Sequence, residues 1–432
     1  MRFRSTNRNS GEASLRDAVL RGLAEDGGLY VPVEIPRLSA ESQERMRSLA
    51  LPELCIEVGR HFLVDDVAEE VLSKIAVEAF DFPAPLVSLT ETIHILELFH
   101  GPTLAFKDFG ARFMARLMGF FVRELGRELT VLVATSGDTG GAVAHGFLGV
   151  PGIRVVILYP SGRVTEAQEK QFTTLGQNVT AVELSGTFDD CQSLAKRAFA
   201  DSELREKIFL TSANSINIAR LIPQMFYFFW AIAQLVDRAK PVVFAVPCGN
   251  FGNLTAGLMA ERMGLPVAQF IAATNVNDVV PEYLRSGHFC PRPSLHTISN
   301  AMDVGNPSNF ARMLDLCNND LQAMRRDLWG CGFSDEETLQ AMREIYDRHR
   351  YVVDPHTAVA VLGWERFRKN STGEYPCVVL ATAHPGKFAS TIERAIGVRV
   401  ELPARLAASL SQPKQSVPMA NSLADLKKFL LS

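Results

Sequence analysis

Residues 131–142 read VLVATSGDTGGA, an apolar run that ends in a polar loop rich in glycine. The pattern predicts a buried strand that turns directly into a helix, because apolar runs bounded by glycine are typical of strands covered on both faces. Two later stretches repeat it, VPCGNFGNL at 246–254 and LATAHPG at 380–386. Ligands bind at the carboxyl ends of strands in open α/β sheets, so each loop is a candidate binding segment.

The rest of the chain continues this alternation of short apolar runs and longer helical patterns, which indicates an α/β fold with mostly parallel sheets. The predicted strands are 93–99, 130–134, 154–158, 179–183, 242–246, 269–273 and 377–381. Helical patterns lie between them at 109–125, 189–199 and 254–263.

Three segments depart from the alternation. Residues 276–335 are rich in Pro, Asn and Ser and predict an insertion between sheet elements, with one short helix at 310–316. The last thirty residues carry three prolines and are expected to cover the surface before a final helix at 423–431. Residues 1–80 predict a helical segment, with pieces at 15–23, 40–49, 52–62 and 68–79.

Composition excludes several classes of protein. The chain has 432 residues, 47% of them hydrophobic and 21% charged, with a formal net charge of −4. This is ordinary globular usage, and the length allows about two or three domains. A mildly acidic chain is a poor general binder of nucleic acid or of anionic membranes, so we expect neither partner. The most apolar stretch, 225–236, is too short to span a bilayer and predicts a buried helix.

Motifs for metals, disulfides and nucleotides are missing from the sequence. The seven cysteines, an odd number without a C-x-x-C pair, argue against a disulfide framework and fit the reducing cytoplasm. The nine histidines show no H-E-x-x-H or H-x-H spacing, and we expect no metal. The glycine loops match neither the Walker A pattern nor a dinucleotide fingerprint, which disfavours those two ligands.

Lys107 is a candidate nucleophile. It stands in FHGPTLAFKDF at 99–109, after a predicted strand and a turn, where a helix begins. Flanking Phe106 and Phe109 would keep water from its amine, and both desolvation and a helix N-terminus lower the pKa of an amine. Such an amine can form a Schiff base, although a surface lysine at a helix start is the common alternative.

Eight motifs stand in a fixed order along the chain. They are GLAEDGGLY at 22–30, HGPT at 100–103 with FKD at 106–108, TSGDTG at 135–140, SANSIN at 212–217, GNFGN at 249–253, SNAMDVG at 299–305, DPHTA at 354–358 and TAHP at 382–385. Together they resemble the threonine synthases of the bacterial and fungal long form, which are pyridoxal-phosphate enzymes of the tryptophan-synthase-β-like fold. The resemblance runs nearly from end to end.

The resemblance implies two open, twisted, mostly parallel-sheet domains with covering helices and the cofactor in the cleft between them. The chain then divides into a helical N-terminal segment (1–80), a smaller α/β domain with the substrate-carboxylate loop (81–220) and a larger cofactor-binding α/β domain (221–432). The larger domain carries the insertion at 276–335. Lys107 is expected at the interface of the two domains.

The resemblance also assigns roles. Lys107 would form the Schiff base with the aldehyde of pyridoxal 5′-phosphate, and Thr382 would hydrogen-bond the pyridine nitrogen. The cofactor phosphate would lie on Gly249, Asn250, Phe251, Gly252 and Asn253. The substrate carboxylate would lie on Thr135, Ser136, Gly137, Asp138 and Thr139. The candidates for the substrate phosphate, chosen for charge and polarity, are Ser161, Arg163, Asn217 and Arg220.

The family reaction converts O-phospho-L-homoserine and water to L-threonine and phosphate, the last step of threonine biosynthesis. The resemblance therefore implies that the chain is a pyridoxal-phosphate-dependent carbon–oxygen lyase that acts on a phosphate ester. Once freed by the incoming substrate, Lys107 would move the protons that this β,γ-elimination and replacement requires. We expect a cytoplasmic enzyme with a small-molecule substrate, active as a monomer or a homodimer.

Two groups of side chains have further expectations. A carboxylate at Asp138 would repel the cofactor's 3′-oxygen, so we expect it to accept hydrogen bonds from amides of its own loop. His356 and His384 lie beside prolines in the site loops, and we expect backbone groups rather than substrate to satisfy them.

Alternatives remain open from the sequence. The first is another lyase of the same fold, such as a serine or threonine dehydratase, a sulfhydrylase or a phospholyase of a phospho-amino acid. The second is a catalytically inactive, vitamin-binding or regulatory homologue, against which the presence of Lys107 argues. A nucleotide-binding module is the third.

Overall fold

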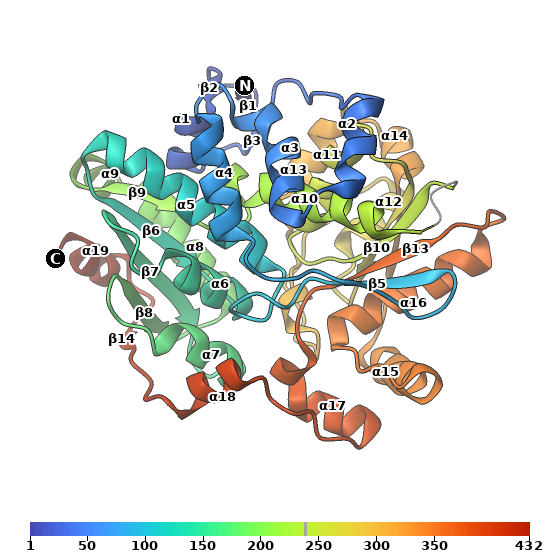
Figure 1. The fold of residues 1–432 in the computed structure, drawn as a ribbon. Coiled ribbons are helices and arrows are strands. Elements are labelled where there is room, and N and C mark those ends of the chain that lie inside the picture. Colours follow the sequence, from blue (N-terminus) through green and yellow to red (C-terminus); the bar gives the residue numbers. More distant parts are fainter. Residues whose placement is uncertain (237–239) are drawn as a thin grey trace.

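Two mostly parallel sheets lie side by side in the computed structural model, which describes residues 1–236 and 240–432 (Figure 1). The 6-stranded sheet has the order β12-β11-β10-β13-β5-β4, and its edge strand β4 runs antiparallel to β5. Its strands are β4 (Leu86–Ser88), β5 (Ile93–Glu97), β10 (Val242–Pro247), β11 (Val267–Thr274), β12 (Leu328–Gly332) and β13 (Cys377–Ala381).

The 5-stranded sheet is wholly parallel and has the order β14-β8-β7-β6-β9. Its strands are β6 (Leu129–Ala134), β7 (Ile153–Pro160), β8 (Val179–Leu184), β9 (Phe209–Ser212) and β14 (Val417–Met419). All seven predicted strands are confirmed. Several are almost wholly apolar, and every residue of β6, β10 and β13 is buried, as parallel strands covered by helices on both faces should be.

Helices cover both sheets. Around the 5-stranded sheet lie α5 (Lys107–Leu125), α6 (Asp138–Phe147), α7 (Glu166–Thr173), α8 (Phe188–Ala200) and α9 (Ser202–Lys207). Around the 6-stranded sheet lie α10 (Ile218–Gln234), α11 (Gly252–Arg262), α15 (Asp335–His349), α16 (Pro355–Asn370) and α17 (Ala389–Ile396). The three helices predicted from their patterns, α5, α8 and α11, are confirmed.

The most apolar helix, α10, packs between α5 and α11. Its side chains from Ile218 to Phe229 are buried, so the helix predicted at 225–236 is present, but it ends at Gln234, its last turn is only partly buried, and Val236 is exposed. Within the described part of the chain, no helix combines the length and the apolar character that crossing a membrane requires.

The two sheets do not follow the predicted boundaries at 81–220 and 221–432. β4 and β5 lie in the first range but extend the 6-stranded sheet, because β5 pairs with β13 along its whole length. β14 lies in the second range but pairs with β8 of the other sheet. Each sheet therefore contains strands from both ranges, so no single boundary along the chain separates the two sheets.

The N-terminal segment contains the predicted helices, as α1 (Leu15–Arg21), α2 (Ala40–Arg45), η1 (Met46–Ser48), α3 (Leu51–Leu63) and α4 (Glu69–Ala79). It also contains a 3-stranded antiparallel sheet that was not predicted, formed by β1 (Arg2–Ser5), β2 (Ala13–Ser14) and β3 (Tyr30–Pro32). Strands this short show no alternation that a sequence pattern could reveal.

The expectation of one short helix in 276–335 was too simple. The predicted helix is present as α13 (Phe310–Leu316), but α12 (Val279–Ser286) and α14 (Leu321–Asp327) accompany it, with the short turn η2 (Asn300–Met302). β12 then joins the sheet edge beside β11. Two glycines among its five residues hide this strand from a reading based on β propensity.

The C-terminal residues return to the 5-stranded sheet. The predicted final helix is confirmed as α19 (Leu423–Leu431), and it packs on α8. Before it come the short turn η3 (Pro385–Phe388), α18 (Ala404–Ser411) and β14. Lys414 holds this segment in place, because its Nζ lies 2.7 Å from Glu169 Oε1 and 2.8 Å from Glu183 Oε2. Figure 1 shows the red C-terminal segment running past both sheets to β8.

Arg312 of α13 ties the N-terminal segment to the loop before α10. Its side chain is fully buried. Nε donates to the carbonyl oxygen of Tyr30 (2.9 Å), Nη1 to that of Ser215 (3.0 Å) and Nη2 to that of Ile216 (2.6 Å). One guanidinium therefore satisfies buried and partly buried carbonyl groups from two separate segments.

Replacing Arg312 by methionine is expected to lower the free energy of unfolding by about 3 kcal/mol, since buried carbonyl groups would lose their donor. Urea unfolding followed by circular dichroism measures the change. Arg285→Met removes an exposed arginine and is expected to stay within about 0.5 kcal/mol of the unchanged protein. Equal losses in the two variants would contradict this account of Arg312.

Candidate active site

The carboxyl ends of β6, β10 and β13 open into one cavity, where α6 and α11 begin. The space, with its mouth to solvent, is about 870 Å³. The three strand-end loops contribute most of its polar lining, namely Ser136, Asp138, Thr139, Gly249, Asn250, Gly252, Asn253 and Thr382. Loops separated by more than a hundred residues along the chain thus meet at one site.

Lys107 reaches this cavity from the first turn of α5. Its Nζ lies 3.6 Å from Asp138 Oδ2 and 5.0 Å from the centre of the Phe106 ring, and its side chain is 16% exposed. Burial lowers the pKa of the Lys107 amine; Asp138 opposes this effect, and the positive charges of Lys387 and Arg220 add to it. The amine is therefore more readily available as a nucleophile and a base than an exposed lysine.

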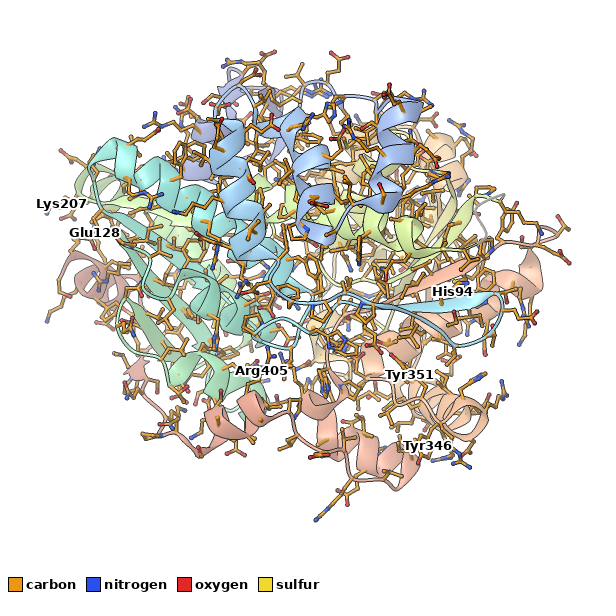
Figure 2. The ribbon with its side chains drawn as sticks, viewed as in Figure 1. His94, Glu128, Lys207, Tyr346, Tyr351 and Arg405 are labelled. Carbon is orange, nitrogen blue, oxygen red and sulfur yellow. The ribbon has the colours of Figure 1, made fainter. Side chains whose placement is uncertain are left out.

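The loop that leads to Lys107 is held from several sides. Arg405 of α18, labelled in Figure 2, donates from Nη1 to the carbonyl oxygen of Gly101 (2.9 Å). The amide and hydroxyl groups of Thr103 donate to Asp108 at 2.8 and 2.7 Å. Because Asp108 follows Lys107 directly, these contacts fix where the lysine side chain starts.

Thr135 does not line the cavity, but its side chain fixes the backbone of the loop at 135–139. Its Oγ1 accepts hydrogen bonds from the amides of Gly137 (2.9 Å) and Gly140 (2.8 Å). Gly137 has a φ of 135°, and a Cβ there would lie 2.5 Å from the Gln168 side chain. Only glycine fits this turn.

The turn leaves Ser136, Asp138 and Thr139 on the cavity wall at the N-terminus of α6. The amides of these three residues have no acceptor among the described residues. Free N–H groups and the positive end of a helix dipole favour an anion.

Asp138 does not bond the amides of its loop, so that expectation was wrong. Its Oδ1 lies 2.5 Å from Lys387 Nζ and accepts a hydrogen bond from Gln168 Nε2 (3.1 Å), while Oδ2 faces Lys107. Burial alone would raise the pKa of the Asp138 carboxyl, but the ammonium groups of Lys387 and Lys107 hold it well below its usual range. Asp138 is therefore an ionised carboxylate between two lysines.

The loop at 249–253 forms a row of amides at the start of α11. None of the five backbone N–H groups finds an acceptor among the described residues. Phe251 has left-handed backbone angles (φ 60°, ψ 16°), which turn the chain so that successive amides face one side. This arrangement fits a phosphate group.

Glycine is required at the edge of this cradle. A Cβ on Gly249 would lie 2.5 Å from the carbonyl oxygen of Ala301 and 3.2 Å from the Cα of Met302. Ala301 and Met302 themselves line the cavity. The 249–253 loop and the 301–302 turn are thus in direct backbone contact on two sides of one site.

Thr382 lies at the end of β13, with its side chain on the cavity. Its carbonyl oxygen accepts from the amide of Phe106 (2.9 Å), which joins the loop to the residue before Lys107. Its hydroxyl bonds no other described residue. The hydroxyl is thus free to bond a ligand.

The two histidines of the site loops each accept a hydrogen bond from a backbone amide, and His356 also pairs with a side-chain carboxylate. His356 Nδ1 lies 2.5 Å from Asp354 Oδ2, and its Nε2 accepts from the amide of Ala301 (3.3 Å). His384 Nδ1 accepts from the amide of Gly386 (3.0 Å). His356 also lines the cavity, where it supports the 301–302 turn.

The four candidates for the substrate phosphate do not come together. Arg220 lines the cavity and donates from Nη1 to the carbonyl oxygen of Ala213 (2.6 Å), while its buried Nε has no partner. Ser161 and Arg163 line a neighbouring cavity that shares Ser136 with the first. Asn217 lies outside both cavities, and its side chain caps α10.

The amide group of Asn217 is fully occupied. Its Nδ2 donates to the carbonyl oxygens of Val19 and Ser212, and its Oδ1 accepts from the amide of Ala219. We do not retain a phosphate-binding role for this residue.

Sequence reasoning missed three side chains. Lys387, five positions after Thr382, reaches Asp138, and Gln168 of α7 bonds the same carboxylate. Asn300 Nδ2 donates to Gln168 Oε1 (3.1 Å) and so connects the 6-stranded half to α7. Lys387 could have been suspected, since it follows the third glycine loop directly.

Comparisons with known proteins agree along the whole chain. A model described as "Threonine synthase N terminus" matches residues 2–80, one described as "Pyridoxal-phosphate dependent enzyme" matches 80–383, and one described as "Threonine synthase, C-terminal" matches 357–430. The threonine synthase of Serratia marcescens is 43% identical over 97% of this chain and 96% of its own.

Two solved structures are also similar. The threonine synthase of Escherichia coli has a TM-score of 0.94 and 42% identity, over 100% of this chain and 99% of that one. A structure of PLP-bound threonine synthase from Brucella melitensis has a TM-score of 0.94 and 36% identity, with the same coverage of both chains.

Proposed function

The chain belongs to the threonine synthase family of pyridoxal-phosphate-dependent enzymes, and on that premise we propose that it converts O-phospho-L-homoserine and water to L-threonine and phosphate in the cavity beside Lys107. The observation that carries the choice of substrate is the set of separate anion-binding groups on this cavity. A phosphorylated cofactor together with a phosphorylated amino acid brings three anionic groups, and the cavity offers three places for them.

The residues present fit pyridoxal phosphate. The unpaired amides of 249–253 at the start of α11 would hold its phosphate, and the free hydroxyl of Thr382 would bond its pyridine nitrogen. Lys107 provides the amine for covalent attachment. When bound, the cofactor supplies an aldehyde for that attachment and an electron sink that stabilises negative charge on neighbouring substrate carbons.

The substrate would be held at two other places. The free amides of Ser136 and Thr139, at the positive end of α6, suit its carboxylate. Arg220 is the cation that suits its phosphate. Burial lowers the pKa of the Arg220 guanidinium to about 10, so it stays charged at neutral pH. Holding both ends would place the carbons between them against Lys107.

Lys107 would then act as the proton carrier. Its Nζ would take the proton from Cα and then one proton from Cβ as phosphate leaves Cγ. A proton would next be returned to Cγ, water would add at Cβ, and a last proton would be returned to Cα. One amine can exchange protons with these carbons because they are adjacent in a substrate that is held at both ends.

Arg220→Gln tests this assignment. We expect it to raise the KM for O-phospho-L-homoserine by about tenfold or more, with a smaller effect on kcat, because a lost charge-assisted hydrogen bond costs about 1.5–3 kcal/mol. Phosphate release and threonine formation measure the rate. Deamination of L-serine, which has no phosphate, provides the control reaction and should not depend on Arg220. A wild-type enzyme that deaminates serine faster than it releases phosphate would contradict the proposal and favour a dehydratase.

A cytoplasmic location is part of the proposal. It is supported by the seven cysteines, all of which are unpaired in the structure and six of which are buried. We also propose that the chain acts as a monomer or a homodimer. Size-exclusion chromatography coupled to light scattering measures this state.

A further inference from the structure

A second lysine lies behind the Lys107 site. Lys387 belongs to the short turn η3 (Pro385–Phe388) that follows the Thr382 loop, and its side chain is 0% exposed. Its Nζ lies 2.5 Å from Asp138 Oδ1 and donates to the carbonyl oxygen of Thr103 (3.0 Å). Burying an ammonium group is costly, so a lysine in such a place needs an anionic partner.

Lys387 connects three parts of the site. It starts from the 6-stranded half, while Asp138 opens α6 in the other half and Thr103 belongs to the loop that leads to Lys107. The carbonyl oxygen of Thr103 also accepts from Gln171 Nε2 of α7 (3.0 Å). Lys387 itself is absent from the lining of the Lys107 cavity.

Asp138 thus has one amine on each side. Oδ1 faces Lys387 at 2.5 Å, and Oδ2 faces Lys107 at 3.6 Å. Only Lys107 opens to the cavity where the reaction would occur. The closer and fully buried amine is the one that lies outside this cavity.

Other charged and titratable groups lie on the elements packed around these side chains. Arg220 of α10 acts on Lys107 and His356 of α16 acts on Asp138, while Asp108 of α5, His145 of α6 and His384 of the loop before η3 are within range of the Lys387 charge. None of these side chains forms a hydrogen bond or ion pair with Asp138 among the described residues. Lys387 is therefore the partner on which the charge of Asp138 chiefly depends.

We propose that Lys387 is a positioning residue for the chemistry of Lys107: it neutralises Asp138 from outside the cavity, so that this carboxylate stays ionised without binding the Lys107 amine as its sole counter-ion. This inference rests on the proposed attachment of the cofactor to Lys107.

The physical reason is a competition for one carboxylate. Without Lys387, Asp138 would retain a single close ammonium group, that of Lys107, and the pair would hold its proton on Lys107. A lysine held protonated is a poor nucleophile and a poor base. With Lys387 present, Lys107 can lose its charge while Asp138 remains paired.

Lys387→Met tests the proposal in the holoenzyme. The midpoint at which bound cofactor changes its visible absorption with pH, and the acidic limb of the kcat profile, are expected to move to higher pH by about one unit or more. The sign follows from the removal of a positive charge that lowers the pKa of Lys107. Lys387→Arg, which keeps the charge, should stay close to the wild type.

Matched control variants distinguish the loss of the Lys387 charge from a general effect of replacing a lysine by methionine. Lys240→Met makes the same chemical change at a surface ion pair with Glu374, 3.4 Å away, and should leave both profiles unchanged. The double variant D138N/K387M removes the carboxylate as well, and its midpoint is expected to return to the wild-type value or below. If Lys387→Met alone folds poorly, the pH midpoint of the double variant still tests the proposal.

Profiles for Lys387→Met that match the wild type, or that move to lower pH, would overturn the inference. If the proposed function itself is wrong, borohydride will fail to fix the cofactor on Lys107 in the wild-type protein. The two failures can therefore be told apart with the same preparations.

Discussion

Replacing Lys107 by alanine is expected to lower the rate of phosphate release from O-phospho-L-homoserine by at least about 10³-fold. Among the described residues that line the cavity, Lys107 is the one lysine. On the proposed function, its loss removes both the amine that would bind the cofactor covalently and the group that would carry protons between Cα, Cβ and Cγ. No other described side chain in the cavity lining carries a primary amine that could replace it.

The fold should survive this change. Asp138 keeps its closer partner Lys387 at 2.5 Å, so no unpaired buried carboxylate is left behind. The variant should therefore unfold like the wild type while turning over almost no substrate. Phosphate release gives the rate, and Lys240→Ala, at an exposed ion pair, is the control that should retain full activity. Turnover by Lys107→Ala within tenfold of the wild type would exclude Lys107 from catalysis.

The second large effect is expected at Gly249. Gly249→Ala should weaken binding of pyridoxal phosphate by at least about 10²-fold, which corresponds to about 2.7 kcal/mol. Its Cβ would lie 2.5 Å from the carbonyl oxygen of Ala301, which is a backbone atom and cannot rotate away. Either the 249–253 amides or the 301–302 turn must shift, and both line the cofactor cavity.

Titration of the cofactor-free protein, followed by the fluorescence of bound pyridoxal phosphate, measures this affinity. Gly11→Ala is the matched control, because a Cβ at Gly11 meets nothing within 4 Å and its backbone lies outside the left-handed region. It should bind the cofactor as tightly as the wild type. Unchanged affinity in Gly249→Ala would show that the phosphate is held elsewhere.

Local sequence patterns predict the central strands of the two large sheets and the loops that follow them. β6, β10 and β13 are apolar runs followed at once by glycine-bearing loops, and burial on both faces permits little else. The order of the strands depends on contacts between distant segments. β5 pairs with β13, and β14 pairs with β8, and no pattern within either segment predicts these pairings.

For the candidate site too, local patterns predict some features and contacts between distant residues determine the others. Lys107 and the amides of 249–253 are recognisable because their chemistry depends on neighbours in the chain. The environment of Asp138 depends on Lys387, which is distant in sequence, and the expectation of loop amides failed for that reason. Asn217 has the right chemistry for a phosphate ligand, but only the structure shows that Val19 and Ser212 already occupy its amide.

The central claim is a covalent bond between the Nζ of Lys107 and the aldehyde of pyridoxal phosphate. Reduction of the purified holoenzyme with borohydride, followed by digestion and mass spectrometry, tests it most directly. The account predicts one peptide that carries the reduced cofactor, with the modification on Lys107. A cofactor fixed on another lysine, such as Lys387, or recovered entirely free from a protein that is active before reduction, would contradict it.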